Sequence, residues 1–427
     1  MKKSLLAVAA IGAFASAAQA QSSVTVYGIL DVGLVGESAR VATGSAVTKT
    51  TGEGFGSSAE STSRLGFKGT EDLGGGLSAF FTVELGLTPN NSFVVATSTA
   101  QNRQTFVGLK KNGIGDFAFG TQYTVVHNAV AATDPGQLNN VAGNLVYTGA
   151  TSTVGGNPSS SSSFGGGNGT AAGDGYTIRA NNMLSLNSAT FAGFTAHGMV
   201  IANNTNSTQT ASTTTGNTGG INNYNGWGLG ADYTWNKLFV TADYQALTAK
   251  NPWSTATVYT PAGSAAGVTQ TTAAGTTGAA TIFGAGQGSA PGLNVKDNQF
   301  YVAATYDFGI LKAYAQYVNR KATSQIDPLS YVNRSAEQIG VRSYVTPTVE
   351  VWANGGLGRY TAFGDGAPTA NLTAWQLGSN YWLSKRTNLY AIYGQQGTSN
   401  VNTGTLFTAN PASYNLTNYA VGVRHTF

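Results

Sequence analysis

The sequence contains no cysteine, which excludes disulfide bonds, thiol chemistry and cysteine-ligated zinc. Charged residues are also scarce: they make up 9% of the 427 residues, whereas a soluble protein usually has about a quarter. Beyond residue 20, no run approaches the ~18 uninterrupted apolar residues of a transmembrane helix. The chain therefore has neither the charge of a typical soluble protein nor the spans of a helical membrane protein.

The N-terminal segment has the pattern of a secretory signal. Lysines precede an apolar stretch over residues 5–18, and the AQA of residues 18–20 has the form of a cleavage site. We expect residues 1–20 to be a cleaved signal peptide and residues 21–427 to form a single domain. Loss of the lysines would bring the net charge of +4 closer to balance. This argues against a nucleic-acid partner, which calls for a clustered basic face.

Glycine is abundant, with 57 residues, and recurs too often for long helices. Instead, apolar and polar residues alternate at period two. At the start of the expected domain, Val24, Val26 and Val32 share one face, while Tyr27 and Asp31 share the other. This alternation indicates strands, because successive side chains of a strand point to opposite sides.

The alternation continues along the chain and predicts sixteen strands. Short turns and long irregular connections join these strands alternately. Such a pattern is typical of an up-and-down barrel whose two ends face different compartments. Two of the long connections, at 202–226 and 251–295, are uncharged and too polar to bury a core, so we expect loops there. The predicted strands are 22–36, 60–71, 76–87, 100–110, 115–124, 176–190, 193–203, 224–235, 238–249, 296–308, 310–321, 334–345, 348–360, 371–383, 386–396 and 415–427.

The hairpin SRLGFKGTEDLGGGLSAFFTVELG, residues 63–86, indicates the solvent on each side. Phe81 and Val83 belong to an apolar face, and Thr82 and Glu84 belong to a polar one. Each strand alone would also fit a soluble sandwich, but so many amphipathic strands with so few charges favour lipid outside and water inside. Open sheet edges are not tolerated in lipid. The predicted fold is therefore all-β: a closed 16-stranded antiparallel transmembrane barrel with short periplasmic turns and long extracellular loops.

Four segments resemble the general diffusion porins of β-proteobacteria, in the Gram-negative porin family: SSVTVYGILDVGL, the hairpin above, RQTFVGLKKNGIGDFAFGTQYT and the terminal NYAVGVRHTF. The resemblance implies a homotrimer in the outer membrane of a Gram-negative bacterium, in contact with outer-membrane lipid and lipopolysaccharide. It also implies that a loop at about 125–175 folds inward to narrow the pore. By the same resemblance, Phe427 ends the strand that the barrel-assembly machinery reads.

Strand parity predicts which basic side chains line the water-filled lumen, where charge determines which solutes pass. These residues alternate with apolar neighbours that would face the lipid. They are Arg64, Lys68, Arg179, Arg342 and Arg424.

Arg103 shares parity with Val107 and Leu109, so it points inward only if a bulge intervenes or if the faces of that strand are reversed. Similar porins carry a basic cluster at mid-height on the barrel wall, and the resemblance implies that Arg64, Arg103 and Arg179 form it here. Where the family often has a further arginine, this chain has Thr121, which weakens the case for strong anion selectivity.

The expected inward loop contains two acids, Asp134 and Asp174, that could face the arginines and create a transverse field. Asp134 could equally be a turn former in its Thr-Asp-Pro-Gly context. Other acids with inward parity would offset the arginines, so we expect only a weak anion preference. These acids are Asp31, Glu84, Asp243 and Glu350.

Patterns of catalysis are missing from the sequence. Its three histidines lie on different predicted elements, and we find no Gly-x-Ser-x-Gly elbow, His-Glu-x-x-His pair or phosphate loop. We expect a channel for small hydrophilic solutes and ions, without enzyme activity, cofactor or metal. Two alternatives share the barrel: a substrate-specific channel, which would differ in its lumen, and a surface adhesin, which would use the long neutral loops.

Overall fold

The computed structural model describes residues 23–43, 46–89, 102–147, 175–210, 218–250, 294–325, 331–363, 369–399 and 412–427. Its strands are β1 (Ser23–Thr43), β2 (Ala46–Ser57), β3 (Arg64–Gly74), β4 (Leu77–Gly86), β5 (Asn102–Lys111), β6 (Gly115–Tyr123), β7 (Arg179–Ser188), β8 (Phe194–Thr210), β9 (Thr218–Trp235), β10 (Leu238–Lys250), β11 (Asn294–Asp307), β12 (Lys312–Ser324), β13 (Tyr331–Tyr344), β14 (Val349–Phe363), β15 (Thr369–Trp382), β16 (Thr387–Ser399) and β17 (Ala412–Thr426). The helix α2 (Val125–Thr133) is too short to cross a membrane, and no other helix in the described ranges is long and apolar enough to do so.

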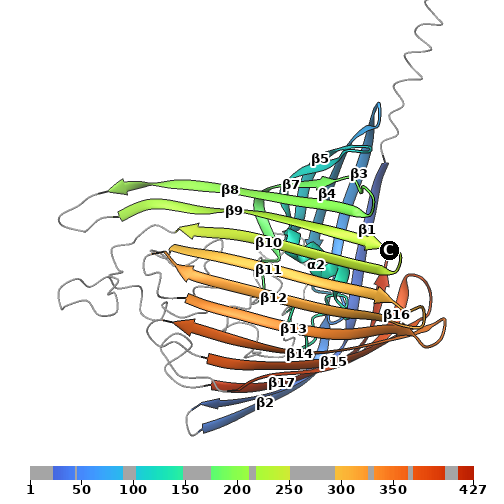
Figure 1. Ribbon diagram of the computed structural model, residues 1–427. Helices are drawn as coiled ribbons and strands as arrows, with labels where there is room; N and C mark the ends of the chain where they lie inside the picture. The colour runs from blue at the N-terminus through green and yellow to red at the C-terminus, as the bar shows by residue number, and fades with distance from the viewer. Residues whose placement is uncertain are drawn as a thin grey trace, which may run out of the picture.

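The strands form one closed antiparallel sheet (Figure 1). The last strand returns to the first: β17 pairs with β1 from Ile29 opposite Thr426 to Thr43 opposite Ala412. β2 and β3 both pair with β1, β3 along its first part and β2 along the rest, so together they fill one position in the barrel. This arrangement confirms the predicted all-β fold with 16 strand positions.

The barrel is apolar outside and polar inside, the reverse of a soluble protein. Leu229 and Ile339 are 61% and 70% exposed, whereas Arg320 and Arg334 are 1% and 2% exposed. Lipid suits this outer face, because a closed barrel satisfies its backbone hydrogen bonds internally and needs no water there.

Two regions that we expected to be loops are strands. Residues 37–43 continue β1, residues 46–57 return as β2, and residues 202–210 and 218–226 lengthen β8 and β9, which reach beyond their neighbours (Figure 1). Their composition was misleading because cross-strand backbone pairing, rather than burial of an apolar face, holds these extensions. Residues 251–293 of the other expected loop lie outside the described residues.

The second strand position is interrupted at residues 58–63, which the sequence pattern did not predict. This segment turns inward, where Oδ2 of Asp31 accepts the backbone N–H of Glu60 at 2.8 Å. Asn140, on the loop after α2, donates its backbone N–H to the carbonyl oxygen of Ala59 in this segment at 2.8 Å. The interruption therefore fastens the wall to the loop inside the barrel.

The helix α2 lies inside the barrel and packs against β8–β12 (Figure 1). It starts after Thr124, whose hydroxyl accepts the backbone N–H of His127 at 3.3 Å. It ends at Thr133, because Pro135 disfavours a helical conformation in the residue before it. Residues 134–147 then continue along the inner wall.

The C-terminal residue completes the seam between the first and last strands. Phe427 and Gly28 exchange two backbone hydrogen bonds, both 3.1 Å long. A Cβ atom at Gly28 would lie 2.4 Å from the Phe427 ring, so the ring packs directly on the glycine. The same ring is 41% exposed on the outer face, beside His425.

Deleting Phe427 should lower the amount of folded barrel in the outer membrane while leaving the conductance of each surviving channel near normal. The deletion removes two seam hydrogen bonds, worth about 0.5–1.5 kcal/mol each, but no side chain of the lumen. Quantitative gels of outer-membrane fractions and single-channel recordings measure the two effects. Phe427→Tyr, which keeps the ring and the backbone, is the matched control. Equal amounts of barrel from the deletion and the control would contradict the prediction.

Candidate pore constriction

Arg64 and Arg103 converge on Glu84, a carboxylate that is only 3% exposed. Arg103 Nε donates to Glu84 Oε1 at 2.7 Å, and Nη1 of Arg64 lies 3.7 Å from the same oxygen. The inward direction of Arg103 results from a β-bulge: the register of β4 and β5 shifts between Glu84 and Leu85, which leaves Arg103 as the extra residue. The bulge overrides the outward parity of Arg103 in the sequence.

Arg179 joins this group through Tyr123. Arg103 Nη2 donates to the Tyr123 hydroxyl at 2.7 Å, and the Arg179 guanidinium lies 5.9 Å from the centre of that ring. His127 packs on Tyr123 with 4.3 Å between ring centres. Burial, followed by the positive charge of Arg179, lowers the pKa of His127 to about 3, so its ring stays neutral near pH 7. The structure thus brings Arg64, Arg103 and Arg179 together, and we call them, with Glu84, the arginine cluster.

Lys68 and Arg424 also face inward. Lys68 Nζ lies 5.4 Å from the ring centre of Tyr27, whose hydroxyl donates to Glu84 at 3.1 Å, so Lys68 adjoins the arginine cluster. Arg424 lies elsewhere, with its Nε 3.4 Å from Glu60 in the inserted segment.

Arg342 is held between the wall and the loop. Its Nε donates to Glu350 at 2.6 Å, its Nη1 donates to the carbonyl of Pro135 at 2.7 Å, and its guanidinium lies 4.9 Å from the ring centre of Trp352. These contacts fix the loop after α2 and compensate the charge of Arg342 locally.

Asp134 is a turn former and does not face the arginine cluster, contrary to one of our expectations. Its carboxylate is 3% exposed and accepts the backbone N–H of Leu138 and the side-chain amide of Asn144, both at 2.7 Å. Burial raises the pKa of Asp134. The acid among the arginines is Glu84 instead, and Asp174 lies outside the described residues.

Neutral amides hold the described part of the loop, and our sequence analysis missed this role. Gln376 and Asn139 exchange side-chain hydrogen bonds of 2.6 and 2.9 Å, and Gln338 accepts the backbone N–H of Leu145 at 3.0 Å. The available signal was a glutamine at an inward position on each of several strands. These residues are Gln245, Gln299, Gln316, Gln338 and Gln376.

A second arginine pair was also missed. Arg320 and Arg334 are cross-strand neighbours on β12 and β13. Arg320 forms a two-pronged ion pair with Asp297, with hydrogen bonds of 3.0 and 2.6 Å. Arg334 donates to the carbonyl of Leu145 at 2.5 Å. The alternation of residues along β12 and β13 predicts that both side chains point inward. Both strands, however, lie outside the four segments that resemble the porin family.

The chemistry of this inner surface is electrostatic. In the described part of the chain, no group of three or more His, Asp or Glu residues could hold a metal ion. The arginine cluster carries more positive than negative charge on a wall that faces the lumen. Such a wall acts on passing ions through its field.

A closed barrel with an apolar outer face, a charged inner wall and a loop folded into its lumen defines an outer-membrane channel protein. The model of a family described as Gram-negative porin matches residues 7–401 of the chain. The chain belongs to this family, which confirms the resemblance seen in the sequence and places the protein in the outer membrane.

Among similar proteins, an outer membrane porin protein of Bordetella pertussis is 36% identical over 142 residues, 32% of this chain and 37% of the relative. The match thus spans little more than a third of that relative. An anion-selective porin from Comamonas acidovorans has a solved structure that superposes with a TM-score of 0.61 at 22% identity, covering 95% of this chain and all of the other. An outer membrane protein of Vibrio cholerae, described in its trimer form, superposes with a TM-score of 0.57 at 15% identity over 95% and 99% of the two chains. At these identities, the two structures establish the fold.

Glu84→Gln should make the channel more selective for anions, because it leaves the charges of Arg64 and Arg103 uncompensated. One unit charge ~8 Å from a passing ion changes its energy by about 0.5 kcal/mol in water, and screening by 0.1 M salt reduces this to about 0.2 kcal/mol. The change has opposite signs for chloride and potassium, so their permeability ratio should change by about twofold. The reversal potential in a salt gradient measures this ratio. Glu53→Gln on β2, which removes an exposed acid away from the cluster, is the matched control. The prediction fails if both variants give the wild-type potential.

Proposed function

We propose that the protein is a general diffusion porin, through which small hydrophilic solutes and ions pass passively with a weak anion preference. The observation that carries this proposal is the arginine cluster, where Arg64 and Arg103 lie against the acid Glu84 and Arg179 adjoins them through the Tyr123 ring. The excess of positive charge favours anions, and the paired acid keeps that preference small.

The other inward charges support a weak preference. Arg342 is paired with Glu350, Arg424 with Glu60, and Arg320 with Asp297. Pairs of this kind cancel most of their field at a distance. The name of the Comamonas structure, an anion-selective porin, agrees with the sign of the preference.

The proposal includes the processing and the constriction inferred from the sequence. Residues 1–20 would be removed as a signal peptide, and the loop at about 125–175 would narrow the pore opposite the arginine cluster. The support for the constriction is that α2 and residues 134–147 line the inside of the barrel, with His127 on Tyr123.

The test is the conductance of the purified protein in planar bilayers. The wild type should give a steady, large conductance that tolerates many solutes. Saturable conductance blocked by one class of sugar or anion would replace the proposal with a substrate-specific channel, and no conductance would favour a membrane anchor.

The double variant Arg64→Glu with Arg179→Glu changes the wall by four unit charges. It should shift the permeability ratio toward cations by about twentyfold at 0.1 M salt, which screens charges over ~10 Å. Folding should survive, because both side chains face the lumen. Normal insertion with an unmoved reversal potential would place these arginines away from the constriction.

We also propose that the protein works as a homotrimer, surrounded by outer-membrane lipid and lipopolysaccharide and inserted by the barrel-assembly machinery. The subunits would pack through the apolar outer faces near the first and last strands. The loop at about 88–99 would reach the neighbouring pore, although residues 90–101 lie outside the described part. The trimer form named for the Vibrio structure supports this assembly.

Unboiled protein should therefore run on SDS gels far above its monomer mass and fall after boiling to no more than the 43.8 kDa of the full chain. Its channels should close in steps of three. The physical reason is that heat is needed to break a barrel whose backbone hydrogen bonds are all internal. A monomer in mild detergent, established by light scattering, would contradict the trimer.

A further inference from the structure

Four side chains on the adjacent strands β6–β9 form a hydrogen-bonded row on the inner wall, near the short turns and away from the arginine cluster. Asn187 Nδ2 donates to Asp116 Oδ1 at 2.8 Å. The His197 ring lies between Asn187 Oδ1, 3.0 Å from its Nδ1, and Asp232 Oδ2, 2.8 Å from its Nε2. The row alternates along the strands with outward residues such as Leu186 and so points into the lumen. We call the row the His197 network.

The directions of these hydrogen bonds determine the protonation of His197. A carboxylate oxygen only accepts, so the part of the Asn187 side chain that faces Asp116 is its NH₂ group. The amide oxygen of Asn187 therefore faces His197, and both ring nitrogens of His197 face acceptors. Only the doubly protonated imidazolium has two donors, whereas a neutral ring would leave one of the two contacts without a hydrogen. The geometry thus requires a positively charged ring.

Acids outnumber bases around this ring. Gly230 stands opposite both His197 and Asp243, and a Cβ atom there would collide with Asp243 Oδ1, so the glycine leaves room for the carboxylate on the side of His197. Asp243 is 2% exposed, and its Oδ1 accepts no hydrogen bond from the described residues. Lys110, on β5, is the cross-strand neighbour of Asp116. The charge of His197 therefore offsets a local excess of carboxylates.

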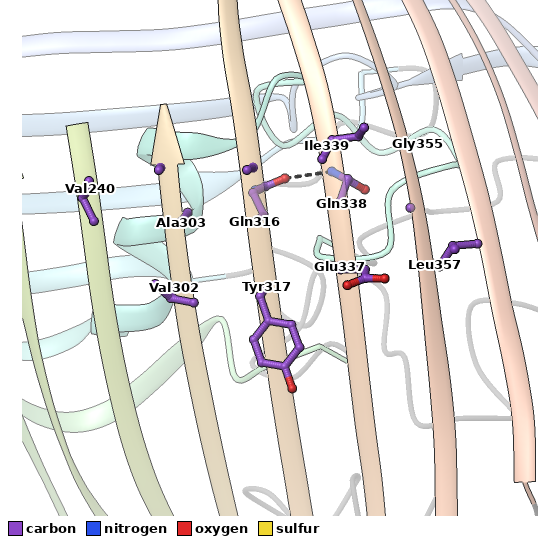
Figure 2. Close-up of a pocket in the computed structure, with 13 residues that line it drawn as sticks. Val240, Val302, Ala303, Gln316, Tyr317, Glu337, Gln338, Ile339, Gly355 and Leu357 are labelled. Atoms are coloured by element: carbon purple, nitrogen blue, oxygen red, sulfur yellow. Dashed lines mark hydrogen bonds between the residues drawn. The ribbon is translucent and has the colours of Figure 1, made fainter. Parts of the chain in front are cut away.

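The other side chains near the network are neutral. Tyr301 is the cross-strand neighbour of Asp243, and its hydroxyl accepts a hydrogen bond from Gln316 at 2.9 Å. Gln338 donates in turn to Gln316 at 2.9 Å (Figure 2). The helix α2, which packs on β8–β10, has a single titratable side chain, His127, and its ring lies beside the arginine cluster. The loss of one charge from the network would thus change the local field substantially.

We propose that His197 is a specificity-determining residue of the pore, which as an imidazolium offsets the acids at this end of the lumen and on losing a proton shifts the ion preference toward cations. The inference rests on the proposed function as a diffusion porin. The His197 side chain is 24% exposed, so water in the lumen can exchange its proton. One unit charge on the wall should change the chloride-to-potassium permeability ratio by about twofold at 0.1 M salt.

The first test is nitrogen NMR of the histidine rings in the full protein, purified without a histidine tag. The sequence has only three histidines, so the signal that His197→Gln loses identifies the ring. If this variant does not fold, the signal retained by both His127→Gln and His425→Gln identifies it instead. Both ring nitrogens of His197 should carry a proton at neutral pH. A ring with a single protonated nitrogen would overturn the proposal.

The second test is the reversal potential in a salt gradient between about pH 6 and about pH 9, a range above the ordinary carboxylate values of ~4 and below the lysine value of ~10.4. The wild type should become up to about twofold less selective for anions as the pH rises and His197 loses a proton. His197→Gln should show the low anion selectivity throughout, and His197→Lys should keep the high selectivity because its ammonium stays charged. His425→Gln, at an exposed position on the outer face, is the matched control and should respond like the wild type.

Asp243→Asn separates the two groups of the network that could change charge, and it should retain the pH response. An equal pH response in the wild type and His197→Gln would overturn the proposal, and a response lost only in Asp243→Asn would overturn it in favour of Asp243. Loss of conductance in the wild type would count against the porin function, while the NMR signal would still decide the protonation of His197.

Discussion

A backbone N–H or C=O group that reaches hydrocarbon finds no water, and it must be paired within the protein. In this chain the requirement is met by the seam in which β17 returns to β1, although the two strands stand at opposite ends of the sequence. Once the sheet is closed, each strand has a lipid side and a lumen side. Polar connections that lie at membrane depth can only be inside. The position of α2 and of residues 134–147, against the inner wall, follows from the same requirement.

The inside of the barrel then has to accommodate polar groups at close range. It does so with two kinds of partner: ion pairs such as Arg320 with Asp297, and neutral amides such as Gln376 with Asn139. The amides fix the loop without adding charge, so the field of the lumen depends on a few ionised side chains. This division of roles explains how a chain with 9% charged residues can have a highly polar interior. The arginine cluster is the place where positive charge exceeds negative charge.

The barrel, its number of strand positions and its inside-outside order could be predicted because strand periodicity is local. Features that depend on pairing between distant residues could not. Arg103 points inward because β5 bulges against β4, and parity along β5 alone gives the opposite direction. The strand break at 58–63 is stabilised by Asp31 and Asn140, which are far away in the sequence. The extensions of β8 and β9 have loop-like composition, since above the membrane neither face of a strand needs to be apolar. The turn-forming role of Asp134 was one of two open interpretations, and only its buried neighbours decide between them.

The strands differ in length around the barrel. β3–β7 have 9 to 11 residues, whereas β8–β17 have 13 to 18. Arg64 is the first residue of β3, but β2 continues the same strand position above it, so Arg64 lies within the wall and not at its rim. An ion that enters from the end with the long connections therefore passes the paired upper parts of β1, β2 and β17 before it reaches the arginine cluster. The field of the cluster thus acts on ions that are already inside the barrel, where a few charges are less diluted by bulk water than at the outer surface.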